Sequence, residues 1–289
     1  MSEGMLAGYS LEKKPSLATI AKVAWLTSGH DKDERIEVYR KTLARADLSW
    51  ATGDSSTGIV QSHYLRVKAH NPDIKAANFA ISGNESEDLQ AQVDRFLAAE
   101  VESDTIFDYV MLMIGANDLA SSDSEGITPA LKYLGNIEAG IRRVLDKDPH
   151  RRLLVVGLPD VHTVFEESAN LVVYRMWGKD IKCESMRRDV YGNKTIFYPE
   201  NKEAYEFTRA IVAQYREGLA NLIERLQGEY LDAEFKFIRE YRKPTNMRKA
   251  LSIDCFHPSE WGQAELAEIT WERGFWPNIS DVQFLAWTD

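Results

Sequence analysis

The sequence predicts a three-layer α/β/α domain built around a central, mostly parallel sheet. Stretches typical of buried strands alternate with stretches typical of helices along nearly the whole chain, which favours strand–helix–strand units. The stretch 107–115 is a nearly continuous apolar run, as expected for a strand covered on both faces, and 152–159 is typical of another buried strand. The chain has 289 residues, of which 44% are hydrophobic, so it can bury a sizeable core.

The strands are predicted from short apolar runs that are bounded by turn residues. The run 76–82 ends at Gly83, and the run 152–159 is stopped by Pro159. The stretch AKVAWLTS, at 21–28, fits either a buried strand or the end of a short helix. The predicted strands are 21–28, 48–53, 76–82, 107–115, 152–159 and 234–240.

The helices are predicted from apolar residues at helical spacing. In the stretch 86–100, for example, Leu89, Val93, Phe96 and Leu97 fall on one face. The predicted helices are 33–46, 60–70, 86–100, 130–147, 202–230 and 260–275.

One long segment, 165–201, interrupts the alternation of strands and helices. It is rich in aromatic and charged residues, and we interpret it as an insertion or lid over the edge of the sheet. We find no internal repeat and no linker, so we expect a single domain over residues 1–289.

Composition excludes several classes of partner. The net charge is −10, which disfavours a nucleic-acid backbone or an anionic membrane surface as main partner. No apolar run approaches the roughly 18 residues of a membrane-spanning helix, and no leader peptide is evident at the start, so the sequence alone indicates a cytosolic protein. We expect a small-molecule substrate, no cofactor and no obligate protein partner.

Polar residues cluster where predicted strands end. Gly83 follows the strand 76–82, Asn117 lies just after the strand 107–115, and Asp254 and His257 precede the last helix. The carboxyl ends of parallel strands form the site in such sheets. An Asp and a His three residues apart can meet, and the carboxylate can then orient the imidazole as a base for a serine nucleophile. The Gly83 N–H and the Asn117 amide are candidate donors to a developing oxyanion.

Four blocks of the sequence resemble the SGNH or GDSL hydrolases, which are serine-dependent esterases and lipases on a flavodoxin-like fold. The blocks are GDSS, NFAISGNESEDL, MIGANDL and DCFHPSEWGQAELA. The stretch SWATG…SHYLRV…NP…NFAISG and the pair Trp177 and Cys183 also resemble the phospholipase B-like and actinobacterial secreted branch, which is usually secreted. The resemblance implies that His257 is the base, that Asp254 orients it, and that Gly83 and Asn117 hold the oxyanion.

The first block departs from the pattern of that branch. There, Gly-Asp-Ser is expected at the end of the first strand, where this chain has Thr27-Ser28-Gly29. Three interpretations follow. Ser55, in Gly53-Asp54-Ser55, is the nucleophile and our first choice; Ser28 is the nucleophile through a one-residue slip; or neither is, and the protein binds a lipid or glycan without catalysis.

The remaining histidines and cysteines have plainer interpretations. His63, on a predicted helix, is expected to be structural, whereas His162 follows a strand and is a candidate substrate contact. Cys183 is interpreted as the remnant of a disulfide in a relative, and Cys255 as a packing residue. The spacing of the acidic and His residues supports no metal site.

Overall fold

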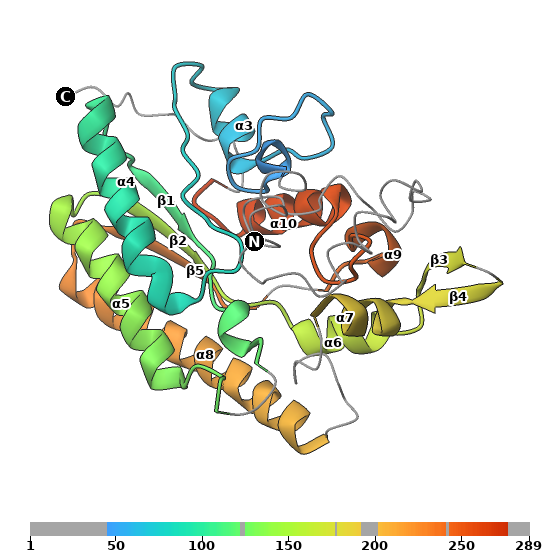
Figure 1. Ribbon diagram of the computed structural model, residues 1–289. Helices are drawn as coiled ribbons and strands as arrows, with labels where there is room; N and C mark the ends of the chain where they lie inside the picture. Colours follow the sequence, from blue (N-terminus) through green and yellow to red (C-terminus); the bar gives the residue numbers. More distant parts are fainter. Residues whose placement is uncertain (1–44, 122–124, 177, 192–201, 241–242, 277–289) are drawn as a thin grey trace.

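The computed structural model describes residues 45–121, 125–176, 178–191, 202–240 and 243–276 (Figure 1). The predicted strand 21–28 lies outside these residues, and so does Ser28. The predicted helix 33–46 also lies outside them except for Arg45 and Ala46.

The sheet is parallel, as predicted. It contains β1 (Tyr109–Leu112), β2 (Arg152–Val156) and β5 (Glu234–Ile238) in the order β1-β2-β5. Tyr109 is paired with Arg152, and Arg152 with Glu234, so the three strands begin at the same level. Their carboxyl ends therefore lie at one edge, where the sequence places its polar blocks.

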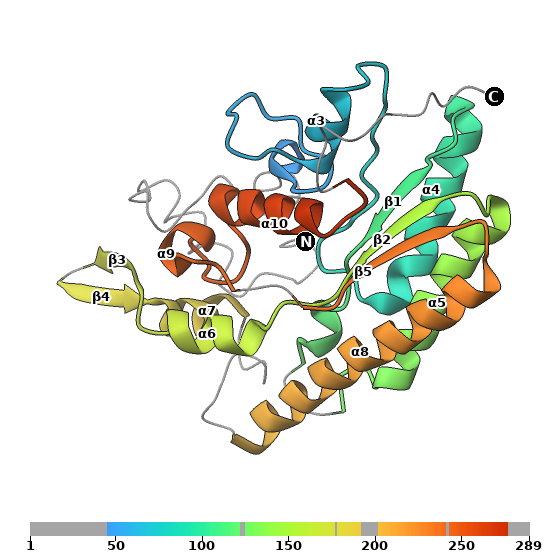
Figure 2. The same ribbon diagram turned by 180° about the vertical axis from the view of Figure 1, so that it is seen from behind.

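Helices cover both faces of the sheet, which confirms the three-layer α/β/α class (Figures 1 and 2). One face carries α4 (Leu89–Ser103), α5 (Ala130–Lys147) and α8 (Lys202–Glu229), and the other carries α3 (His63–Lys68) and α10 (Glu260–Glu272). The strand β2 serves both layers because successive side chains point to opposite faces. Leu153 and Val155 belong to the core under α4, α5 and α8, whereas Leu154 and Val156 belong to the core under α10.

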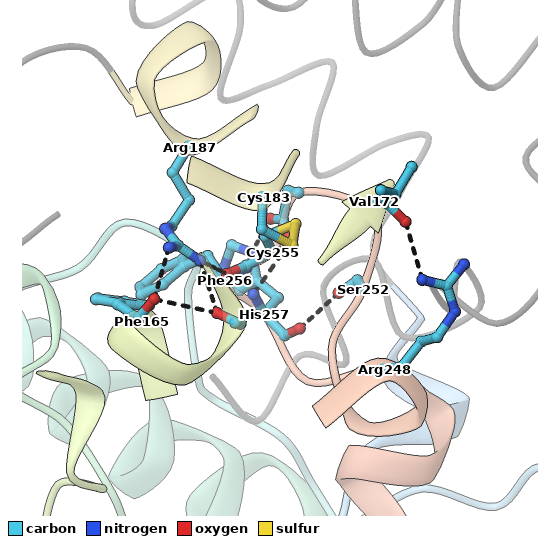
Figure 3. The surroundings of a disulfide bond; sticks show 11 residues. Phe165, Val172, Cys183, Arg187, Arg248, Ser252, Cys255, Phe256 and His257 are labelled. Carbon is cyan, nitrogen blue, oxygen red and sulfur yellow. Dashed lines mark hydrogen bonds and ion pairs between the residues drawn. A yellow bond between two sulfur atoms is a disulfide. The ribbon is translucent and has the colours of Figure 1, made fainter. Parts of the chain in front are cut away.

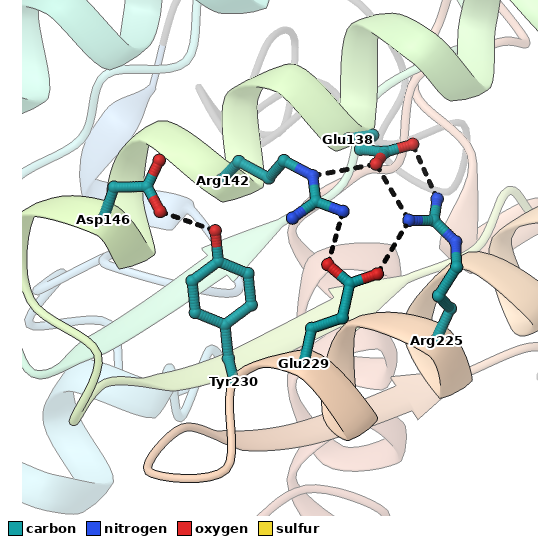
Figure 4. Close-up of polar contacts among 6 residues, drawn as sticks. All are labelled: Glu138, Arg142, Asp146, Arg225, Glu229 and Tyr230. Carbon is teal, nitrogen blue, oxygen red and sulfur yellow. Dashed lines mark hydrogen bonds and ion pairs between the residues drawn. The ribbon is translucent and has the colours of Figure 1, made fainter.

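A network of charged side chains joins α5 to α8 at the surface (Figure 4). Glu138 accepts from Arg225 Nη2 at 2.7 Å and from Arg142 Nε at 2.8 Å, and Arg142 also reaches Glu229 at 2.6 Å. The hydrogen bonds from Arg225 and then Arg142 lower the pKa of Glu138 to about 2. The network fixes the register between two helices whose apolar faces bind the same side of the sheet.

A buried ion pair lies at the amino ends of the strands, opposite the edge that carries the polar blocks. Arg151, which precedes β2, donates from both Nη atoms to Glu100 near the end of α4, at 2.7 and 2.9 Å. The Arg151 side chain is 0% exposed and that of Glu100 is 5% exposed. Glu100 also accepts from the Phe107 backbone N–H at 2.8 Å. The pair thus ties α4 to the starts of β1 and β2.

The predicted strand 48–53 is wrong. Residues Ala46–Leu48 form a short 3-10 helix, η1, and the chain then turns, with the Gly53 N–H donating to the Ser49 carbonyl at 2.9 Å. A Cβ at Gly53 would lie 2.5 Å from that carbonyl oxygen, so only glycine fits this tight turn. Local bonds to Ser49 take the backbone groups that a strand would need.

The predicted strand 76–82 is also absent from the described sheet, and residues 76–82 instead form an irregular segment (Figure 1). An apolar cavity of about 470 Å³ is lined by this segment, by 107–114 including all of β1, and by residues of α4. In the described strands β1 pairs only with β2, and all four of its residues are half-buried, whereas four of the five residues of β2 are buried. The expectation that 107–115 is covered on both faces is therefore met only in part.

The predicted insertion is described as far as residue 191. It contains the end of α6 (Val161–Ser168), the antiparallel hairpin β3 (Val172–Met176) and β4 (Lys179–Lys182), and α7 (Cys183–Tyr191). The hairpin projects away from the parallel sheet, while α6 lies beside the short helix α9 (Met247–Ala250) (Figure 1). A role as a lid stays a prediction.

Candidate active site

Asp254 and His257 contact each other in the loop between α9 and α10. His257 Nδ1 lies 2.6 Å from Asp254 Oδ2, and Asp254 Oδ1 accepts from the backbone N–H groups of Phe256 and His257, both at 3.1 Å. The Asp254 side chain is 1% exposed, whereas that of His257 is 12% exposed. With Nδ1 facing the carboxylate, Nε2 is the ring nitrogen that can face a substrate.

The backbone around the pair is fixed on both sides. The His257 carbonyl accepts from the Ser252 N–H at 2.9 Å and from its hydroxyl at 2.7 Å. Ser259 caps the N-terminus of α10 with its side chain, which accepts from the Gly262 N–H at 3.3 Å. The loop is therefore a rigid platform for the imidazole.

Cys183 and Cys255 form a disulfide, which corrects the interpretation of Cys183 as a remnant and of Cys255 as a packing residue (Figure 3). The interpretation from sequence was wrong because the two residues stand 72 positions apart, and nothing in their spacing shows that α7 packs against the His257 loop. Both cysteines are 0% exposed.

The Gly83 and Asn117 blocks lie side by side, although the strand predicted before Gly83 is absent from the described sheet. Asn117, the first residue of the short helix η3 (Asn117–Leu119), donates from Nδ2 to the Asn84 carbonyl at 2.9 Å. An amide carries two N–H donors, so this bond uses one of them. Gly83 has a φ of +83°, which glycine adopts without strain.

The buried carboxylate of Asp118 joins the Gly83 and Asn117 blocks a second time. The sequence had not indicated this link. Asp118 accepts from the backbone N–H of Ser86 at 2.8 Å and from its hydroxyl at 2.5 Å. Burial raises the pKa of Asp118, while the bonds from Ser86 oppose the shift. No local pattern in the stretch GNESEDL indicates this bond, because the partner lies 32 residues away.

Ser55 lies in a turn, not at the end of a strand. Its N–H donates to the Asp47 carbonyl at 2.9 Å, and its Oγ lies 3.4 Å from Thr57 Oγ1. Thr57 in turn donates to Glu260, the first residue of α10, at 2.7 Å. The Ser55 turn therefore packs beside the helix that follows His257, but within the described residues no hydrogen bond joins Ser55 to His257.

The two other histidines singled out from the sequence are buried. His63 is held between the Tyr109 hydroxyl and Thr270 Oγ1, both at 2.8 Å, and burial lowers its pKa to about 3. This arrangement agrees with the structural role expected for His63. His162 is 1% exposed and bonds Thr208 at 3.0 Å, and burial lowers its pKa to about 4. Its burial does not support the role of substrate contact for which it was a candidate.

A family model described as GDSL-like Lipase/Acylhydrolase matches residues 47–270. The matched range contains Ser55, Gly83, Asn117, Asp254 and His257, and it begins after Ser28. The comparison with curated proteins finds no match. Among the residues that the structure describes, no group of three or more His, Cys, Asp or Glu side chains is arranged to hold a metal ion.

Proposed function

The chain belongs to the GDSL-like lipase/acylhydrolase family, and on this premise we propose that it hydrolyses carboxylic esters through an acyl-enzyme on a serine. The observation that carries the proposal is the 2.6 Å contact between His257 Nδ1 and the buried carboxylate of Asp254. A serine hydroxyl is a weak nucleophile at its own pKa and needs such an oriented base.

In the proposed mechanism the serine hydroxyl attacks the acyl carbon while His257 Nε2 accepts its proton. The bond to the alcohol breaks as His257 returns that proton to the leaving oxygen. Water then attacks the acyl-enzyme with the same base, which releases the acid and restores the serine. The Gly83 N–H and the Asn117 amide hold the oxyanion, whereas the Ser55 N–H is bonded to the Asp47 carbonyl at 2.9 Å.

Ser55 is the nucleophile that we first predicted, and two observations bear on it. The family match includes Ser55, and its turn packs against the start of α10 through Thr57 and Glu260. Against it, its hydroxyl is engaged with Thr57, not with His257, and the described residues just before it form the 3-10 helix η1 and not a strand. Catalytic hydrogen bonds are often long before substrate binds, so this geometry alone does not eliminate Ser55.

Ser28 is the second candidate, through the one-residue slip in the first block, and it lies outside the residues that the structure describes. The family match begins at residue 47, after Ser28. Peptide mapping of the labelled serine therefore decides between Ser28 and Ser55.

We propose a small ester or a lipid as the substrate. The net charge of −10 argues against a nucleic-acid partner, and no described helix is long and apolar enough to cross a membrane. The finer resemblance to the phospholipase B-like and actinobacterial secreted branch is supported by the Cys183–Cys255 disulfide. Disulfides persist in oxidising compartments, so we propose such a compartment for this protein in place of the cytosol that the sequence alone indicated.

Labelling with a fluorophosphonate probe, followed by peptide mapping of the adduct, tests the proposal. A label on Ser55 or on Ser28 identifies the nucleophile, and the matching Ser→Ala variant should lose the label and at least ~10³-fold of the esterase activity. His257→Ala should slow labelling by a similar factor without loss of the fold. Folded protein that takes no label and turns over no short acyl ester would refute ester hydrolysis and favour the non-catalytic lipid or glycan binder.

A further inference from the structure

Two side chains of α7 hold the loop that carries Asp254 and His257 (Figure 3). Cys183, the first residue of α7, is bonded to Cys255. One turn further along α7, Arg187 Nη1 donates to the Cys255 carbonyl at 3.1 Å. The side chain and the backbone of the residue next to Asp254 are thus both tied to a helix from the predicted insertion.

Arg187 extends the tie to α6. It is 2% exposed and also donates to the Phe165 carbonyl and to the Ser168 hydroxyl, both at 2.9 Å. Its guanidinium lies 4.8 Å from the centre of the Phe165 ring, which in turn lies 5.8 Å from the Phe256 ring. The Phe256 ring packs against the His257 imidazole at 4.8 Å. Arg187 therefore joins α6 to α7 directly, and it is linked to the imidazole through the Phe165 and Phe256 rings.

The backbone at Cys255 needs such restraint. Its φ is +60°, in the left-handed region that a residue with a Cβ adopts at a cost of about 1 kcal/mol or more. This conformation turns the chain sharply between Asp254 and Phe256, and the turn lets Asp254 Oδ1 accept from the N–H groups of both Phe256 and His257. A relaxed φ at Cys255 would separate these partners.

We propose that Cys183 and Arg187 are positioning residues for His257, and that cleavage of the Cys183–Cys255 disulfide disables the base while the sheet stays folded. The inference rests on the proposed function, because the activity concerned is the proposed ester hydrolysis. It makes this activity depend on the Cys183–Cys255 disulfide, which does not touch the substrate. A dithiol reagent would supply the two electrons and two protons that convert the disulfide to two thiols, and would itself become a cyclic disulfide. The left-handed turn at Cys255 would then lose its covalent anchor.

The test compares two disulfide-free variants that differ by one methyl group. Cys183→Ala/Cys255→Ala removes the bond and leaves a Cβ at the strained position, and we expect kcat to fall roughly 10- to 100-fold with KM within about twofold. Cys183→Ala/Cys255→Gly removes the same bond but accepts the positive φ freely, so it should recover several-fold of the lost kcat. Arg187→Lys, which keeps the charge but not the planar fork, should lower kcat in the intact disulfide form.

Glu100→Gln is the matched control for lost stability, because it weakens the buried pair at the opposite end of the sheet. At temperatures below its thermal transition, Glu100→Gln should keep the kcat of the protein without substitutions. If Cys183→Ala/Cys255→Ala keeps that kcat as well, or if the Gly variant is no better than the Ala variant, the proposal is wrong.

A readout that does not depend on turnover separates this inference from the proposed function. The proton between His257 Nδ1 and Asp254 should give a far-downfield NMR resonance in the intact protein, assigned by its loss in His257→Ala. We expect this resonance to disappear in Cys183→Ala/Cys255→Ala and to return in the Gly variant. An intact protein without esterase activity but with this pattern would refute ester hydrolysis and keep the positioning role. An unchanged resonance in every variant would overturn the positioning role. If the Ala variant fails to fold, the same resonance is followed while the disulfide of the intact protein is reduced. Its loss would support the positioning role, and its persistence would overturn it.

Discussion

Asp254→Asn is the substitution that probes the proposed base most directly. Both carboxylate oxygens of Asp254 are engaged: Oδ1 accepts from the backbone N–H groups of Phe256 and His257, and Oδ2 lies 2.6 Å from His257 Nδ1. An asparagine keeps the two backbone bonds if its carbonyl oxygen takes the place of Oδ1. Its NH₂ group then faces Nδ1, which must become an acceptor, so the proton moves to Nε2. The imidazole that results cannot accept a proton from a serine.

The size of the effect follows from the same contacts. The alternative orientation of the amide restores the useful tautomer but gives up two backbone hydrogen bonds, at about 1 kcal/mol each. About 2 kcal/mol corresponds to a roughly 30-fold excess of the inactive arrangement, since 1.36 kcal/mol is a factor of ten. Loss of the carboxylate charge beside the imidazolium adds to this, and the same change in a Ser-His-Asp triad costs about 10⁴-fold. We therefore expect kcat to fall between about 30-fold and about 10⁴-fold.

The assay is hydrolysis of a chromogenic short-chain ester, together with the rate of fluorophosphonate labelling. Both rates should fall together, and the thermal transition should change little because the backbone contacts of Oδ1 persist. The double variant Asp254→Asn/His257→Ala should be no slower than His257→Ala, because the two residues act as one unit. An Asp254→Asn protein that keeps more than a tenth of kcat would refute the reasoning.

Three further outcomes follow from the described contacts. Arg151→Ala should lower the free energy of unfolding in urea by about 3–5 kcal/mol, because it leaves the Glu100 carboxylate buried without its guanidinium. The double variant Arg151→Met/Glu100→Leu should recover much of this loss. Equal losses in the two variants would contradict this account. His63 has a folded pKa of about 3 against 6.5 when unfolded, so its contribution to stability is complete above pH 6.5 and is lost towards pH 3 at up to about 1.4 kcal/mol per pH unit. His63→Gln should flatten that slope in denaturant titrations at several pH values, and an unchanged slope would exclude His63 as its source. Asn117→Ala should reduce kcat about 10²-fold with little change in KM, and a change confined to KM would remove Asn117 from the oxyanion site.

The sequence predicted the parts of the fold in which local pattern and tertiary environment agree. The stretch 152–159 is apolar on both faces and becomes β2 between two helix layers, and the helices predicted at 86–100 and 130–147 correspond to α4 and α5. The Asp254–His257 contact could be predicted because the two residues stand three positions apart in one loop, which brings the carboxylate within reach of the imidazole. Asn117 does reach the Asn84 carbonyl, although residues 76–82 form an irregular segment and not the predicted strand.

Other features depend on contacts that no local pattern reveals. The stretch 48–53 has the composition of a strand, but the hydrogen bonds that Ser49 accepts and the crowding at Gly53 make it a turn. This error misplaced Ser55. The burial of His162 could not be inferred from the sequence, because His162 contacts Thr208 of α8, which lies 46 residues further along the chain. The disulfide and the role of Arg187 required the packing of α7 against a loop far along the chain.

The parallel sheet has a consequence for how the chain reaches its folded state. β1 pairs with β2 across the whole of α5, and β2 pairs with β5 across the segment that contains α6, α7 and α8. Such long-range pairings form late, because a long loop has to close before any contact compensates for the lost chain entropy. Until β5 arrives, the buried run of β2 presents an unpaired apolar edge to other chains. Refolding yield should therefore fall steeply with protein concentration.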